Sequence, residues 1–159
     1  MVDKMRRTKI VVDMLERVKI KQISQDETEA VLEALLLAIM IDGEVAEDEL
    51  NTLESASHLF NWRAAYSIDE FVGEYVEQLN VAEIDIRKRT DELSYDIAAR
   101  LKSSWLKEET YYLVYRITTA DNVVQDIENT LLENFASALE LSPGQRSSVE
   151  SRVRDSISE

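Results

Sequence analysis

Strong helix breakers are almost absent from this chain, whose 159 residues include only three glycines and one proline. Glycine loses more conformational freedom in a helix than other residues, and proline removes a backbone donor, so both interrupt helices. Ala, Leu and Glu, which favour helices, are common in the sequence. Because 45% of the residues are hydrophobic, the chain has enough apolar material for a core. We therefore expect an all-α fold, a single-domain bundle of seven to eight helices.

Apolar residues recur at helical spacing in seven segments. The predicted helices occupy about residues 3–21, 25–41, 46–60, 68–80, 81–102, 105–120 and 124–139, with a short polar helix after Ser142. The second is apolar nearly all round, so we expect it at the centre of the core. Three of the helices begin with capping-box sequences, "SQDE", "SIDE" and "SPGQ", at Ser24, Ser67 and Ser142. We divide the chain into an N-terminal amphipathic helix (1–24) and a helical domain (25–159).

The net charge of −14 is unevenly distributed along the chain. Residues 1–21 contain seven basic and three acidic side chains, whereas residues 22–86 contain one basic and sixteen acidic side chains. Such an acidic body repels nucleic-acid phosphates and anionic lipids, so we expect no nucleic-acid partner. The basic segment is predicted to pack across the acidic surface of its own domain.

One helix-turn-helix sequence occurs twice. "LLLAIMIDGEVAEDELNTL" (35–53) aligns with "VYRITTADNVVQDIENTLL" (114–132) at a constant offset of 79 residues. In each copy an apolar helix is followed by Asp-Gly or Asp-Asn, which favours a left-handed turn, and by a Glu seven residues after the Asp. The repeat predicts two pseudo-symmetric helix-turn-helix units.

This repeated motif, together with "ALELSP" (138–143), resembles the TerB tellurite-resistance family over roughly residues 25–150. A related domain stands at the N-terminus of certain DnaJ-type co-chaperones. The resemblance implies an all-helical bundle and a stress-response or tellurite-resistance role. It also implies that a metal ion or a partner protein binds an acidic surface.

The repeat supplies the first candidate metal ligands. Glu49 and Glu128 each begin an apolar stripe, so both carboxylates are expected to point inward, where they need partners. As third residues of their helices, they would cap the backbone amides at the helix start. Alternatively, the two turns meet and share a divalent cation, zinc or calcium, among four carboxylates: Asp42, Glu49, Asp121 and Glu128. The EF-hand pattern is not met, because Ala46, Glu47 and Leu53 occupy loop positions five, six and twelve.

A second candidate pair lies on the outer face of the predicted third helix. Glu54 and His58 are spaced i, i+4 and could chelate zinc. His58 is the only histidine in the chain, and surface pairs of this type are commonly just solvated. The metal hypothesis and the purely solvated alternative both stay open for this pair.

The sequence contains no pattern typical of an enzyme. It has no cysteine and one histidine, which excludes Cys–His nucleophilic sites, and it has neither a phosphate-binding loop nor a dinucleotide fingerprint. The aromatic residues around the predicted sixth helix are expected to line the core: Trp105, Tyr111, Tyr112 and Tyr115.

We therefore predict a non-enzymatic accessory protein that binds a divalent metal ion or a partner protein through its acidic face. The alternative is a scaffold or dimerisation module whose carboxylates only cap helices. No apolar run reaches the length of about 20 residues that spans a bilayer. We expect a cytoplasmic protein without an integral membrane segment. Whether the chain forms a homo-oligomer is left open by the sequence.

Overall fold

The computed structural model describes residues 23–41, 65–81, 86–119 and 126–157. All regular elements in these ranges are α-helices, which confirms the predicted all-α class. The described residues form six helices: α2 (Gln25–Met40), α4 (Ile68–Val81), α5 (Ile86–Arg100), α6 (Ser104–Thr118), α7 (Asp126–Ala138) and α8 (Pro143–Ile157). None of them is long and apolar enough to cross a membrane.

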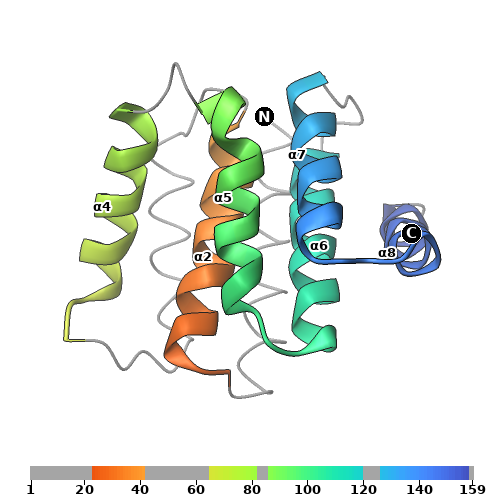
Figure 1. Ribbon diagram of the computed structural model, residues 1–159, viewed down its shortest axis with the longest axis horizontal. Helices are drawn as coiled ribbons and strands as arrows, with labels where there is room; N and C mark the ends of the chain where they lie inside the picture. The colour runs from red at the N-terminus through yellow and green to blue at the C-terminus, as the bar shows by residue number, and fades with distance from the viewer. Residues whose placement is uncertain (1–22, 42–64, 82–85, 120–125, 158–159) are drawn as a thin grey trace.

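Five of these helices run along a common direction, and α8 crosses them, so that it is seen end-on in Figure 1. Helix α4 lies at one edge of the bundle and packs on α2. Helix α2 also packs against α5 and α6, while α7 packs against α5 and α6. Helix α8 contacts α6 at the opposite end of the molecule from α4.

The core is built around α2, as its all-round apolar sequence predicted. Eleven of its sixteen residues are buried, and Leu32, Leu36 and Leu37 are fully enclosed. Burying one leucine side chain contributes about 1.5–3 kcal/mol, so this helix supplies a large part of the driving force for folding. The predicted core role of the α6 aromatics is confirmed too: Tyr111 is fully buried, and the others pack partly against the core: Trp105, Tyr112 and Tyr115.

Two capping boxes form as predicted. The Ser24 hydroxyl accepts from the Glu27 amide, and the Glu27 carboxylate accepts from the Ser24 amide, both at 3.2 Å. Ser142 and Gln145 make the same reciprocal pair at the start of α8, at 2.9 and 3.1 Å. At α4 the Glu70 amide donates to the Ser67 hydroxyl at 3.1 Å.

Some predicted helix bounds need correction. The predicted helix over 81–102 is wrong at both ends, because Val81 is the last residue of α4 and the next helix covers Ile86–Arg100. Ser103 caps α6 through the Leu106 amide, which forces the preceding helix to stop earlier. The last helix is not short but has 15 residues, since buried valines hold it against the bundle. The predicted helices over 3–21 and 46–60 lie outside the described residues.

Candidate functional site

Five of the six predicted metal-binding residues lie outside the described part of the chain: Asp42, Glu49, Glu54, His58 and Asp121. The sixth, Glu128, lies in the first turn of α7. Among the described residues, no group of three or more His, Asp or Glu side chains is arranged to hold a metal ion. The metal hypothesis for these six residues stays a prediction.

Glu128 occupies the position that the sequence predicted. Helix α7 begins at Asp126, which makes Glu128 its third residue, and the carboxylate is buried with 3% of the residue exposed. Leu131, Leu132 and Phe135 of the same stripe are also buried. The predicted inward orientation is therefore confirmed. A carboxylate at this point faces the positive end of the helix dipole.

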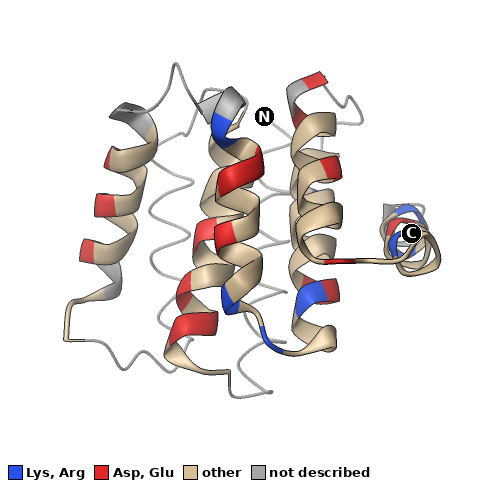
Figure 2. Ribbon diagram, in the orientation of Figure 1, with Lys and Arg blue, Asp and Glu red and all other residues tan. Residues whose placement is uncertain are grey.

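The outer face of α4 carries a row of carboxylates, which we call the acidic stripe: Glu70, Glu74 and Glu77. All three are exposed and follow each other at i, i+4 and i+7, so they project from one side of the helix. In Figure 2 the acidic positions of α4 lie along the side of its ribbon that is turned away from α2 and α5. Within the described ranges, no lysine or arginine pairs with any of the three.

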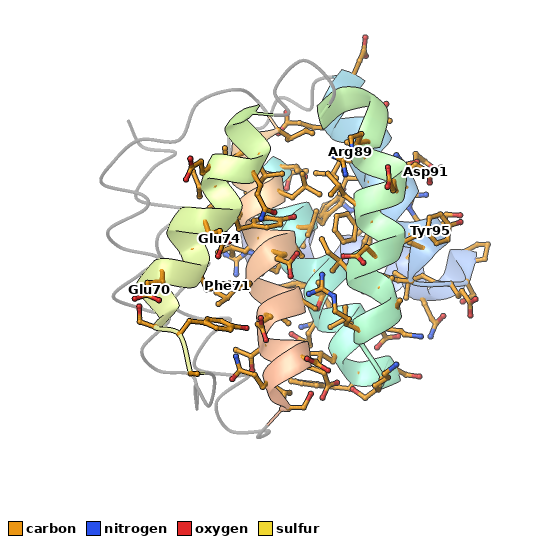
Figure 3. All side chains as sticks on the ribbon, turned by 60° about the vertical axis from the view of Figure 1, so that its left-hand side comes forward. Glu70, Phe71, Glu74, Arg89, Asp91 and Tyr95 are labelled. Carbon is orange, nitrogen blue, oxygen red and sulfur yellow. The ribbon has the colours of Figure 1, made fainter. Side chains whose placement is uncertain are left out.

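Among the described residues, no neighbouring segment packs over Gly73, which lies beside the acidic stripe on α4. A Cβ atom built there meets no atom of another described segment within 4 Å. Figure 3 shows Glu70 and Glu74 on α4, with α2 lying between them and the α5 residues Asp91 and Tyr95. With respect to the described helices, the stripe is thus an uncovered surface at one edge.

Contacts at the start of α4 fix the stripe relative to the core. The Tyr66 hydroxyl donates to the Glu29 carboxylate of α2, and the Tyr66 ring stacks on Phe71 with centroids 6.2 Å apart. The hydrogen bond to Glu29 raises the pKa of Tyr66 to about 12. The first turn of α4 is therefore tied to α2 by a polar and an aromatic contact.

A partly buried polar junction joins α2 and α5 in the same region. Arg100 of α5 donates to the Glu33 carboxylate of α2 and to Asp96, the latter at 3.0 Å. Burial raises the pKa of Glu33, and the Arg100 charge opposes that shift. The Tyr75 hydroxyl of α4 is buried without a hydrogen-bond partner among the described residues. Burial, together with the Glu33 charge, raises the pKa of Tyr75.

The opposite end of the molecule is richer in arginine. Arg146 of α8 binds Glu133 of α7 through two hydrogen bonds of 2.8 and 3.0 Å, and it also donates to Glu150 and to the Tyr111 hydroxyl. The Arg146 hydrogen bonds lower the pKa of Glu133. Tyr111 in turn donates to Glu150 at 2.9 Å. This network joins α6, α7 and α8.

Comparison with known proteins yields no match: no protein-family model, no curated protein and no solved structure matches this chain. The resemblance to the TerB family therefore rests on the sequence motif alone.

The sequence-based prediction did not single out the acidic stripe, although its signal was present. The i, i+4, i+7 spacing of glutamates on α4, with Phe71, Tyr75 and Leu79 on the other side, marks a solvent-facing charged row. The arginine-rich end had no comparable local signal, because its partners come from three helices.

Proposed function

We propose that this chain is a non-enzymatic binding module that engages a basic partner protein through the acidic stripe of α4. The observation that carries the proposal is the row Glu70, Glu74 and Glu77, which is exposed, free of basic partners among the described residues and placed on an edge helix. The seven-residue span corresponds to about 10 Å along the helix axis. A lysine- or arginine-rich segment of similar length would match it in charge and extent.

The geometry favours a protein partner over a metal ion at this surface. Side chains at i, i+4 and i+7 diverge along a helix and are spread over two turns, whereas a divalent ion needs several oxygens converging at 2.0–2.6 Å. A basic segment can instead interact with carboxylates that are spread along the helix, and such complementary charges also speed its association. For zinc or calcium the proposed ligands remain those of the repeat and of the Glu54–His58 pair.

The proposed TerB-like architecture draws support from the bounds of two helices. Helices α2 and α6 begin at residues 25 and 104, which are separated by the same 79 positions as the sequence repeat. Ser24 and Ser103 cap them in equivalent positions, and the two helices pack against each other. These features support a pseudo-symmetric pair of units within a bundle of seven to eight helices. A stress-response or tellurite-resistance role follows from this resemblance.

One observation favours the alternative of a scaffold with structural carboxylates. Glu128 is buried at the third position of α7, where a carboxylate stabilises the helix start without any ligand. In this alternative, the carboxylates of the repeat only stabilise helix ends, and a partner binds at the acidic stripe alone.

Charge removal at the stripe tests the proposal. Binding of a fluorescein-labelled decalysine peptide is measured by anisotropy at low and at high salt. The triple variant Glu70→Gln/Glu74→Gln/Glu77→Gln should weaken binding about tenfold or more at low salt, because it removes adjacent charges worth up to about 1 kcal/mol each. Wild-type binding should also weaken as salt rises.

The matched control removes three exposed carboxylates elsewhere: Glu92→Gln, Asp126→Asn and Glu140→Gln. Its net charge equals that of the stripe variant, so a specific site predicts less than about a twofold loss. Equal weakening of both triple variants would show that only the overall charge matters and would refute the stripe as a site.

A further inference from the structure

Two arginine side chains from different helices lie against one tyrosine ring at the α6–α8 contact. The guanidinium carbon of Arg152 lies 4.3 Å from the centroid of Tyr112, and that of Arg116 lies 5.6 Å from it. Arg116 also donates to the Tyr112 hydroxyl at 3.3 Å. The two guanidinium carbons are therefore at most about 10 Å apart, the sum of both distances.

The charges at this point are only partly balanced by the described carboxylates. Arg152 pairs with the buried carboxylate of Glu109 at 3.3 Å, while 40% of the Arg152 side chain stays exposed. Arg116 has no carboxylate partner among the described residues, and its interactions there are with Tyr112. Arg146, by contrast, donates hydrogen bonds to Glu133, Glu150 and Tyr111.

Arg116 and Arg152 are both partly exposed, and Glu109 is the one carboxylate that pairs with either of them among the described residues, so one positive charge is left unbalanced there. A small anion bound at Arg116 would also be attracted by the charge of Arg152, whose guanidinium carbon lies at most about 10 Å away. The planar guanidinium also presents paired donors that match two oxygens of a carboxylate or a phosphate.

We propose that Arg116 and Arg152, held on Tyr112, form a binding site for a small oxyanion, a carboxylate or a phosphate group. The site lies at the end of the molecule opposite the acidic stripe and is independent of it. A long polyanion such as a nucleic acid would be repelled by a chain of net charge −14.

The test measures the melting temperature of the full chain at pH 7 in sodium phosphate or sodium acetate, against sodium chloride of equal ionic strength. A ligand present at about ten times its dissociation constant should raise the melting temperature of a chain of this size by about 3–5 °C. A larger rise in phosphate indicates a phosphate group as the ligand, and a larger rise in acetate indicates a carboxylate.

Arg116→Gln is the decisive variant, because Arg116 has no ion pair in the described structure whose loss would confound the result. The ligand-dependent rise should disappear in Arg116→Gln and persist in Arg154→Gln, because Arg154 is an exposed residue of α8 that donates to Ser151 and not to Tyr112 in the described structure. Arg116→Lys keeps the charge but not the paired donors, so part of the rise should remain. Absence of any rise in the wild type, or an equal rise in Arg116→Gln, would overturn the proposal.

Discussion

Tyr75 and Tyr111 are both buried, but they differ in whether the side-chain hydroxyl has a hydrogen-bond partner. The Tyr75 hydroxyl is buried without a partner among the described residues, whereas the Tyr111 hydroxyl donates to Glu150 and accepts from Arg146. A buried polar group without a hydrogen bond costs about 1–3 kcal/mol, and a hydrogen bond to a charged group contributes about 1.5–3 kcal/mol. The same chemical change should therefore have opposite effects at the two positions.

We expect Tyr75→Phe to leave the free energy of unfolding unchanged or to raise it by about 1 kcal/mol, since only an unpaired hydroxyl is removed. Tyr111→Phe should lower it by about 1–3 kcal/mol, because Glu150 and Arg146 each lose a partner. Urea unfolding of both variants at pH 7, followed by circular dichroism, measures the two changes. A loss of stability in Tyr75→Phe equal to that in Tyr111→Phe would contradict the assignment.

Sequence reasoning at the level of single residues succeeded where partners are close along the chain. The burial of Glu128 follows from its place at the head of an apolar stripe, and the Ser24–Glu27 box follows from a three-residue spacing. The contact of Arg152 with Tyr112 joins residues 40 positions apart on two helices. No local pattern encodes such a pair, because it depends on how the helices cross.

Among the helix ends, the C-terminus of α7 contains a residue in an unfavourable backbone conformation. Glu140 has φ 57°, in the left-handed region. Its amide donates to the Ser137 carbonyl and the Leu141 amide donates to the Ala136 carbonyl, both at 3.1 Å. These two bonds form a Schellman motif, in which glycine normally occupies the position of Glu140. This motif is the local structure of "ALELSP" (138–143), a segment that by its sequence indicated only a family resemblance.

Glu140→Gly should stabilise the protein by about 0.5–1 kcal/mol, because glycine adopts the left-handed conformation without a Cβ clash. Glu140→Ala is the matched control: it removes the same charge but keeps the Cβ atom, so no comparable gain is expected. Thermal unfolding of both variants measures the difference. Equal stability of the glycine and alanine variants would show that Glu140 is not strained.

Predicting helices from the sequence worked best where caps are local. The start of α8 at Pro143 was predicted from Ser142 and Gln145, and its hydrogen bonds confirm it. The boundary between α4 and α5 was misplaced, since the apolar pattern runs on through residues 81–86 without a strong break. The length of α8 depends on tertiary burial of Val149 and Val153, which its polar sequence does not reveal.

Among the described helices, α4 carries acidic but no basic side chains, whereas α8 carries three arginines. The described ion pairs are mainly at the surface, where each contributes about 0–1 kcal/mol and is weakened by salt. The net charge of −14 opposes folding through repulsion among many carboxylates at once. Which effect dominates determines the sign of the salt dependence of stability.

We expect repulsion to dominate, so the melting temperature should rise between about 10 and 150 mM NaCl. The screening length falls over this range from about 30 to about 8 Å, which removes long-range repulsion and preserves bonded pairs. Choline chloride should act like NaCl if screening is the cause. The Glu70→Gln/Glu74→Gln/Glu77→Gln variant, with three fewer negative charges, should show a smaller rise than wild type. A melting temperature that falls with salt would mean that the ion pairs, including Arg146–Glu133 and Arg100–Glu33, outweigh the repulsion.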